Sequence, residues 1–528
     1  MANAAALRKA GHPSPVSARV SVRSGADQET ELKLKLHAVD VTNLRKRLDA
    51  LGASRHQRID NVYYDTPDHR LAQAQAALRL RSIGKGRSRH WVQTVKTQDS
   101  ESALSVRGEW ERPAPGGRID LALLADSPLA QLLENGASAG HGLADLRPVF
   151  RTVFDRTAWD LTLDAAHVEA VIDLGEIQAN GRTEAVCEAE LELLAGDPAA
   201  LLELALQLAG ARARRRADLS LLPYGLSKAA RGYRLALGRG PAPFSASFAT
   251  AHRAFTAQQR IGEAARRLVA IGMSTMLANA ADYSPQADPE LVHQARVAMR
   301  RMRAGLDLLG AGAEVPERLR QSLRIWAGRF GVVRDWDVLC GEHLPPLASA
   351  APASMEEVWK RLRAAATKQR DSARESLWRQ LQSPAFAEFA LRALRWSLSV
   401  PTKRGKRLQA VARKLVRSRQ HRLTALARRF ADLPIERQHK ARIQAKALRY
   451  GIEMLQASLP KKLRRSALPA LARFQDAAGG ARDALIVQAI VARMTRSVPL
   501  RQHVDEWART QRAAAIAKAQ RLAANLQE

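Results

Sequence analysis

The chain has 528 residues, of which 84 are Lys or Arg and 52 are Asp or Glu, so its formal charge at pH 7 is +32. Such an excess of positive charge favours a polyanionic partner over a neutral small molecule. The two cysteines, Cys187 and Cys340, exclude a disulfide framework and a structural zinc site, and no uncharged apolar stretch is long enough for an obvious membrane span.

The first segment, residues 1–26, contains Arg, Lys, Ser, Pro and Gly but no acidic residue. It has no apolar core segment and little amphipathic pattern, so we expect a disordered tail. An organellar targeting peptide is the alternative interpretation of the same composition.

The charge then divides the chain in two. Residues 1–240 contain 33 basic and 29 acidic side chains, whereas the remainder carries +28 of the net charge. Gly, Pro and Ser at the boundary predict a linker over residues 236–247. Period-two alternation before it predicts antiparallel strands, and helical spacing after it predicts helices. We therefore expect an α+β chain, with a β-rich domain at 27–235 and an all-α domain at 248–525.

In the β-rich domain, charged and apolar residues alternate along short segments. In residues 29–36 the carboxylates and ammoniums share one face of a strand, while Thr and three Leu share the other. Similar patterns return further along the chain. They carry Arg79 and Arg81, then Lys96, then Arg107, Glu109 and Glu111, then Asp173, and then Glu188, Glu190 and Glu192.

Strands with one charged face can close into a barrel that has a polar lumen and a helix-covered exterior. Because burying an ion without compensation costs several kcal/mol, the lumen requires water, ion pairs or a matching ligand. Carboxylates suit Mg²⁺ or Mn²⁺, and Arg and Lys suit phosphate oxygens. A metal together with a polyphosphate satisfies both sets of side chains.

This domain resembles the CYTH family, also called triphosphate tunnel metalloenzymes, over residues 27–235. The resemblance rests on the ordered motifs Glu29-Thr-Glu31-Leu-Lys33, Arg79-Leu-Arg81, Lys96, Arg107-Gly-Glu109-Trp-Glu111, Asp173, Glu188-Ala-Glu190 and Lys228. It implies an eight-stranded antiparallel β-tunnel that binds a triphosphate end-on and uses a divalent metal, Mg²⁺ or Mn²⁺.

The resemblance also implies residue roles. The metal ligands are Glu29, Glu31, Glu188 and Glu190. The catalytic, triphosphate-binding residues are Lys33, Arg79, Arg81, Lys96, Arg107 and Arg156, together with Lys228 on a helix that plugs the tunnel. Arg151 competes with Arg156 because the register of that strand is open, and Glu109, Glu111 and Asp173 are expected as metal-linked or supporting acids.

The function expected of the tunnel is metal-dependent hydrolysis of inorganic triphosphate to diphosphate and phosphate. No covalent nucleophile is needed. One alternative is a cytoplasmic, granule-associated protein that binds polyphosphate without hydrolysing it. Another is a different reaction of the family: adenylate cyclisation, or hydrolysis of thiamine triphosphate or of RNA 5′-triphosphate ends.

The second domain contains an internal repeat. His293, Arg296, Arg300 and Arg303 recur 146 positions later as His439, Arg442, Lys446 and Arg449. At helical spacing, each set covers one face that borders the apolar residues. Two such faces turned toward each other would repel unless a polyanion or water lay between them. The repeat therefore predicts a duplicated helical bundle with a cationic groove.

These motifs, together with Arg334-Asp335-Trp-Asp337, resemble the CHAD domain over residues 248–525. That family implies binding of long-chain polyphosphate, on granules in the bacterial cytoplasm. Nucleic acid remains an alternative polyanion, although few aromatic residues flank the stripes. Asp335 and Glu453 either orient arginines or are solvent-exposed helix charges, and residues 403–430 are predicted to form a basic helix of unassigned role.

Overall fold

The computed structural model describes residues 27–526 except 85, 87–88, 99–103, 125–126, 128, 130–144, 165, 212–215, 245–254 and 401–404. The expected tail at 1–26 lies outside the described residues. Among the helices described, none has the length and apolar character needed to cross a bilayer. Cys187 and Cys340 are both free thiols.

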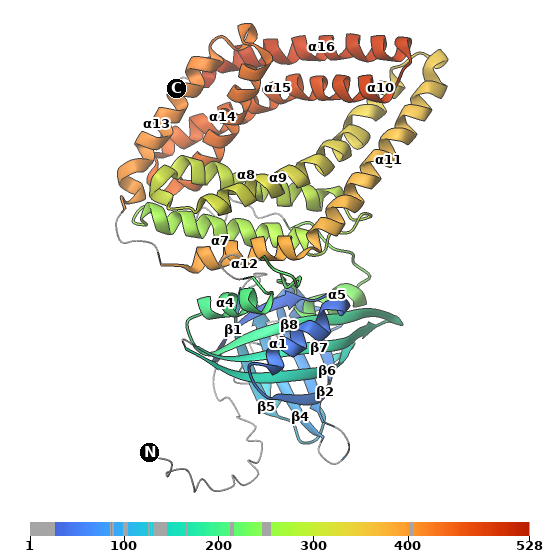
Figure 1. Cartoon of the computed structure of the whole chain (residues 1–528), viewed down its shortest axis with the longest axis vertical. Coiled ribbons are helices and arrows are strands. Elements are labelled where there is room, and N and C mark those ends of the chain that lie inside the picture. Colours follow the sequence, from blue (N-terminus) through green and yellow to red (C-terminus); the bar gives the residue numbers. More distant parts are fainter. Residues whose placement is uncertain are drawn as a thin grey trace, which may run out of the picture.

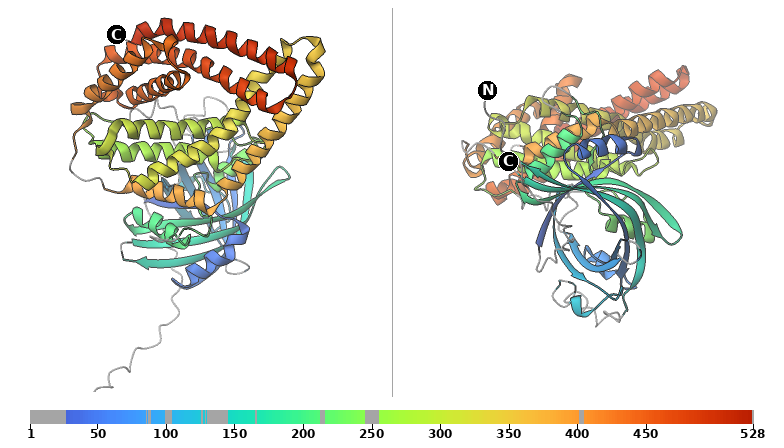
Figure 2. Two further views of the ribbon diagram at one scale, coloured as in Figure 1. Left: turned by 45° about the horizontal axis from the view of Figure 1, so that its top comes forward. Right: turned by 60° about the horizontal axis from the view of Figure 1, so that its bottom comes forward.

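The N-terminal part is a closed antiparallel barrel. Its strands are β1 (Asp27–Lys35), β2 (Ser54–Asp65), β3 (Ala76–Ile83), β4 (His90–Gln98), β5 (Leu104–Pro113), β6 (Arg147–Leu163), β7 (Ala166–Ala179), β8 (Arg182–Gly196) and β9 (Leu222–Pro223). They pair in the order β5-β4-β3-β2-β6-β7-β8-β1-β9, and β5 also pairs with β1, which closes the ring. Figure 2 shows these strands curving around an open centre.

The sheet has nine strands where eight were expected. The additional strand, β9, is only two residues long and pairs with Leu34 and Lys35 at the end of β1. It was missed because two residues carry no period-two signal. The eight long strands form the predicted tunnel.

Short helices pack around the barrel. They are α1 (Val41–Asp49), α2 (Arg70–Gln73), α4 (Ala199–Leu208) and α5 (Lys228–Ala236). Residues of α2 and α5 line the cavity, whereas α1 and α4 pack on the apolar face of β1: Leu32 and Leu34 are fully buried in a core shared with Leu44 of α1 and Leu201 of α4. The charged residues of β1 consequently face the opposite side, into the barrel.

The C-terminal part is all-helical. Its helices are α7 (Ile261–Ala280), α8 (Pro289–Leu309), α9 (Glu317–Val338), α10 (Leu344–Ser349), α11 (Glu356–Leu381), α12 (Pro384–Leu398), α13 (Leu408–Ala427), α14 (Ile435–Met454), α15 (Lys461–Met494) and α16 (Val498–Ala523). Within the basic segment at 403–430, residues 408–427 form α13, as predicted, and residues 403 and 404 lie outside the described residues. Figure 1 shows α7 and α12 as the layer nearest the barrel, α15 and α16 across the far end of the helical domain, and α11 rising between these two ends.

The two copies of the repeat pack against each other through α8 and α14. Glycines at equivalent positions of the repeat make this close approach possible. A Cβ on Gly305 would lie 3.3 Å from Met454 Sδ, and a Cβ on Gly451 would lie 2.5 Å from Leu308 Cδ2. The contacts are reciprocal, because Leu308 and Met454 are also equivalent positions. The predicted duplication is therefore present as a pseudo-twofold helix pair.

The barrel and the helical bundle share an apolar core and polar contacts. Helix α12 packs on α4 and β9. On this side, Glu203 of α4 forms an ion pair with Arg395, and the Ala217 amide donates to Glu388 Oε2 at 3.1 Å. The linker is also held, because the side chain of buried Asn279 exchanges hydrogen bonds with both the N–H and the C=O of Phe244.

Candidate functional site

The barrel encloses a charged cavity of about 770 Å³. Both acidic and basic side chains of the predicted site line it, and they come from strands on all sides of the ring. The predicted residues in the lining are Glu29, Glu31, Lys33, Arg79, Arg81, Lys96, Arg156, Glu190 and Lys228, together with Glu109 and Glu111.

The first strand supplies three of these side chains. Glu29, Glu31 and Lys33 alternate with apolar residues, and each is less than a tenth exposed. Glu29 accepts from Lys96 Nζ at 2.8 Å, whereas Glu31 forms an ion pair with Lys33. Each carboxylate of β1 is thus partnered by a lumen lysine, which accounts for charge burial in this strand.

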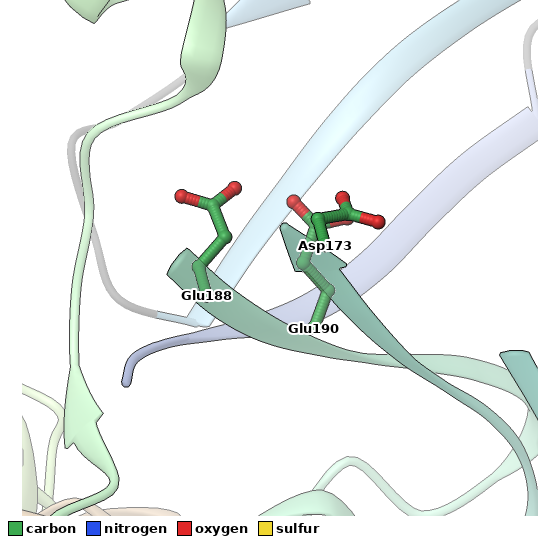
Figure 3. Close-up of side chains that lie close together, drawn as sticks. All are labelled: Asp173, Glu188 and Glu190. Carbon is green, nitrogen blue, oxygen red and sulfur yellow. The ribbon is translucent and has the colours of Figure 1, made fainter. Parts of the chain in front are cut away.

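Three carboxylates gather next to β1, on β7 and β8. Asp173, Glu188 and Glu190 each have an oxygen within 4.8 Å of the others, and Figure 3 shows their side chains on these neighbouring strands. Backbone pairing produces the cluster, because Asp173 lies opposite Glu188 in the β7–β8 register. Asp173 is fully buried, so this cluster is deeper in the protein than a surface acidic patch.

Two cations each contact more than one member of this cluster. Lys228, at the first turn of α5, lies 2.7 Å from Asp173 Oδ2 and 3.1 Å from Glu190 Oε1 and also contacts Glu188. Arg156 of β6 binds both Asp173 oxygens at 2.8 and 2.7 Å and Glu190 at 3.0 Å. Burial alone would lower the pKa of Arg156, but Asp173 and Glu190 outweigh it and hold the pKa well above its ordinary value.

On the opposite wall, Arg79 and Arg81 share the acids Glu109 and Glu111. Burial, followed by repulsion from Arg79, lowers the pKa of Arg81 to about 10. The Arg81 Nε donates to the neutral Asn61 Oδ1 at 3.0 Å, and Arg79 reaches Glu109 only at 3.4 Å. Buried Arg79 Nε has no hydrogen-bond partner among the described atoms. This wall therefore has donors available for an anion.

The donor set of the carboxylate cluster fits a divalent metal. Hard oxygen ligands suit Mg²⁺ or Mn²⁺, and Asp173, Glu188 and Glu190 place theirs within reach of one another. Of the four predicted ligands, only Glu188 and Glu190 belong to this cluster. Asp173, expected as a supporting acid, is its third member. Glu29 and Glu31 form ion pairs with Lys96 and Lys33, and their role as metal ligands stays a prediction.

The structure places the two competing arginines of β6 on opposite faces. Arg156 points into the cavity, whereas Arg151 is half exposed and pairs with Asp60 on the outside. Their separation by five residues makes this outcome necessary in a regular strand. Arg107 lies in β5 opposite Glu29, and its side chain lies outside the described part of the structure.

Sequence reasoning missed several residues of the site. Arg231 binds Glu188 Oε2 at 2.9 Å and Glu184 Oε1 at 2.7 Å, and Asn61 and Tyr63 line the cavity. Arg231 could have been found because it lies one helical turn after Lys228. Phe154 also contributes, since the Lys228 ammonium lies 5.0 Å from its ring centroid.

In the helical domain, the two basic stripes meet between α8 and α14. Burial, followed by the positive charges of Arg442, Arg300 and Arg296, lowers the pKa of Lys446 to about 7. The guanidiniums of Arg296 and Arg442 each lie against a glycine, and the two glycines occupy equivalent places in the repeat. A Cβ on Gly331 would lie 3.4 Å from Arg296 Nε, and a Cβ on Gly479 would lie 3.6 Å from Arg442 Nε.

The other stripe residues have different surroundings. His293 and His439 are partly buried, and burial and neighbouring arginines lower the pKa of both. Arg303 is exposed, and Arg449 lies 3.6 Å from Glu453. These four residues border the cluster formed by Arg296, Arg300, Arg442 and Lys446, which we call the cationic cluster.

Asp335 and Glu453, whose roles the sequence left open, both lie near arginines. Glu453 lies within 4 Å of Arg301 and Arg449, and its side chain is only 20% exposed. Asp335 is exposed, and its negative charge opposes the effect of burial on the pKa of Arg296. For Glu453 this favours orientation of arginines over a free surface charge.

The structure thus joins a closed tunnel with a mixed-charge lumen to a duplicated helical bundle with a cationic cluster. Family models agree with this division: residues 27–226 match the CYTH domain and residues 267–492 match the CHAD domain. The chain therefore contains a CYTH domain followed by a CHAD domain.

Individual relatives cover parts of the chain. An inorganic triphosphatase of Haemophilus influenzae is 30% identical over 175 residues, which are 32% of this chain and 46% of that protein. An uncharacterized Mycobacterium tuberculosis protein is 28% identical over 323 residues, or 56% of this chain and 55% of the relative. The chain thus spans about half the length of these curated relatives. Among solved structures, the CHAD domain of Ricinus communis is 24% identical, with a TM-score of 0.46, over 54% of this chain and 97% of that domain.

Proposed function

We propose that the tunnel hydrolyses inorganic triphosphate to diphosphate and phosphate in a reaction that requires Mg²⁺ or Mn²⁺. The observation that carries the proposal is the division of one cavity into two walls. Glu190 of the carboxylate cluster lines one wall, and Arg79 and Arg81 line the other, where the buried Arg79 Nε has no hydrogen-bond partner among the described atoms. The similarity to an inorganic triphosphatase supports the same reaction.

In this mechanism the side chains of the chain bind and orient the substrate. Arg79 and Arg81 hold phosphate oxygens, and Lys33 and Lys96 add positive charge along the lumen. Asp173, Glu188 and Glu190, together with the predicted ligands Glu29 and Glu31, would hold the metal, which when bound neutralises phosphate charge and makes water a better nucleophile. Arg156 and Lys228 position those carboxylates and place positive charge where negative charge builds up on the phosphate oxygens in the transition state.

The test is a comparison of tripolyphosphate, ATP and thiamine triphosphate under identical Mg²⁺ or Mn²⁺ concentrations. The proposal predicts phosphate release from tripolyphosphate with the highest kcat/KM, abolished by EDTA. Preference for ATP or thiamine triphosphate would identify a different reaction of the tunnel. Tight binding of tripolyphosphate without release would identify a binding protein.

We propose further that the helical domain binds long-chain polyphosphate at the cationic cluster. Arg296 and Arg300 come from one copy of the repeat, and Arg442 and Lys446 come from the other. Their mutual repulsion is relieved when a polyanion lies between them. A cytoplasmic protein with this property is expected on polyphosphate granules.

We predict that polyphosphate affinity falls as the pH rises above about 7. Burial and the charges of Arg442, Arg300 and Arg296, partly offset by Asp483, lower the pKa of Lys446 to about 7. Below pH 7 the lysine is already charged in the unbound protein. Above pH 7 it is mostly neutral, and because a bound polyanion raises its pKa, binding takes up a proton. Affinity should therefore fall by up to about tenfold per pH unit between pH 7 and 9.

Titration calorimetry in buffers of different ionisation enthalpy measures this proton uptake directly. In the unbound protein His293 and His439 are neutral across this pH window, because burial and neighbouring arginines lower their pKa values from the usual range near 6.5. Lys446→Arg keeps the charge at all these pH values and should remove the dependence. Equal proton uptake by the parent and this variant would show that Lys446 is not the titrating group.

A further inference from the structure

Ala281 and Asp282, the two residues that follow helix α7, accept hydrogen bonds from side chains of three separate segments of the tunnel domain. Lys35, at the end of β1, donates to the Ala281 carbonyl at 2.9 Å. Tyr224, directly after β9, donates to Asp282 Oδ1 at 3.1 Å, and Arg234 of α5 donates to Asp282 Oδ2 at 2.6 Å. Both oxygens of one carboxylate of the helical domain are thus bound by the tunnel.

Helix α5 links this contact to the carboxylate cluster. Lys228, Arg231 and Arg234 follow one another at intervals of three residues and share a broad face of the helix. Lys228 lies among the cluster carboxylates, Arg231 binds Glu188, and Arg234 binds Asp282. The first turn of α5 is therefore anchored to the site and its last turn to the helical domain.

The anchor at Asp282 is sheltered from water. Its side chain is 10% exposed, so its hydrogen bond with the Arg234 guanidinium is charge-assisted and only weakly screened. Burial followed by the charge of Asp282 raises the pKa of Tyr224 well above its ordinary value, which keeps the hydroxyl proton in place as a donor.

The helical domain also holds Asp282 firmly from its own side. The neighbouring Tyr283 is buried and donates to the Arg374 carbonyl at 3.4 Å. Arg374 in turn forms a buried ion pair with Asp337 at the end of α9, at 2.8 Å, and donates to the Pro285 carbonyl at 3.1 Å. The turn that carries Asp282 is consequently tied to α9 and α11.

We infer that Asp282 is a positioning residue of the tunnel site: through Arg234 and Tyr224 it sets where α5 lies and thereby where Lys228 meets the carboxylate cluster. The helical domain is then part of the geometry of the tunnel and does more than tether it. The inference rests on the proposed hydrolysis only for its kinetic readout, because the placement of α5 can be measured without turnover.

The test compares Asp282→Asn with Glu203→Gln in the full chain. Both substitutions remove the charge of an acid that pairs with an arginine between the domains, but Glu203 pairs with Arg395 away from α5. Asp282→Asn should lower kcat/KM for tripolyphosphate by about tenfold, the size expected for a lost charge-assisted hydrogen bond. Glu203→Gln should leave it unchanged, and Asp282→Glu should restore part of the loss.

A double-mutant comparison separates positioning from a general loss of structure. In a Lys228→Gln background, Asp282→Asn should cause little additional loss, because its effect acts through Lys228. An equal fold-loss in both backgrounds, or full activity of Asp282→Asn in the parent background, would overturn the inference.

Hydrogen–deuterium exchange provides the readout that does not depend on catalysis. Amides of residues 228–236 should exchange faster in Asp282→Asn than in the parent, and Glu203→Gln should leave them protected. If the parent releases no phosphate but this difference is present, the proposed reaction fails and the positioning role stands. Unchanged exchange in Asp282→Asn would overturn the positioning role whatever the activity.

Discussion

Replacing Glu190 by glutamine is expected to reduce metal-dependent phosphate release from tripolyphosphate by at least about a hundredfold. Glu190 belongs to the carboxylate cluster and lies within 3.5 Å of Lys33, Arg156 and Lys228. Glutamine has the same shape but no charge, so the variant loses a metal ligand and leaves three buried cations with less compensation. Steady-state rates at several metal concentrations measure the effect, and higher metal should restore part of the activity.

Glu176→Gln is the matched control for this variant. Glu176 lies on β7, as Asp173 does, but it does not line the cavity, and its carboxylate accepts from Gln178. This variant should hydrolyse tripolyphosphate at the parent rate. A Glu190→Gln protein that is folded and as active as the Glu176→Gln control would exclude the carboxylate cluster from the reaction.

Removing the cationic cluster is expected to abolish tight polyphosphate binding by the helical domain. The variant replaces Arg296, Arg300, Arg442 and Lys446 by alanine. Each lost phosphate contact should lower the slope of log K against log salt by about 0.7, as for single-stranded nucleic acids, so the total change is about 3. Binding of fluorescently labelled long-chain polyphosphate across a salt series measures both the affinity and the slope.

A control must remove the same charge elsewhere. Alanine at Arg361, Arg363, Lys368 and Arg379, which are exposed on α11, lowers the net charge equally without touching α8 or α14. This control should keep most of the affinity. If both quadruple variants bind alike at every salt concentration, binding follows net charge and the cationic cluster is not a site. Tighter binding of an RNA than of polyphosphate by the parent would identify a different polyanion.

Local pattern was enough to predict the tunnel wall. In β1, the alternation of Glu29, Glu31 and Lys33 with leucines already implied one charged and one apolar face, and the structure has these faces. The duplication was also visible in sequence, because the spacing of Arg296 and Arg300 is repeated by Arg442 and Lys446. Glycines that allow α8 and α14 to approach each other occupy equivalent positions as well.

What sequence could not predict depends on the pairing of distant residues. The sequence favoured Arg156 but left Arg151 as a competitor, because shifting a strand by one residue exchanges its faces and the register of β6 follows from its pairing with β2 and β7. Asp173 joined the carboxylate cluster because β7 pairs with β8. Asp282 gave no signal at all, because its partners lie 48 and 58 positions away in a different domain.

A crystal structure of the full chain with tripolyphosphate and Mn²⁺ tests the central claim most directly. The account predicts phosphate oxygens bound by Arg79 and Arg81 inside the tunnel and an anomalous Mn²⁺ peak at the oxygens of Asp173, Glu188 and Glu190. Tripolyphosphate bound only on the helical domain, with Mn²⁺ absent from the lumen at saturating concentration, would contradict it.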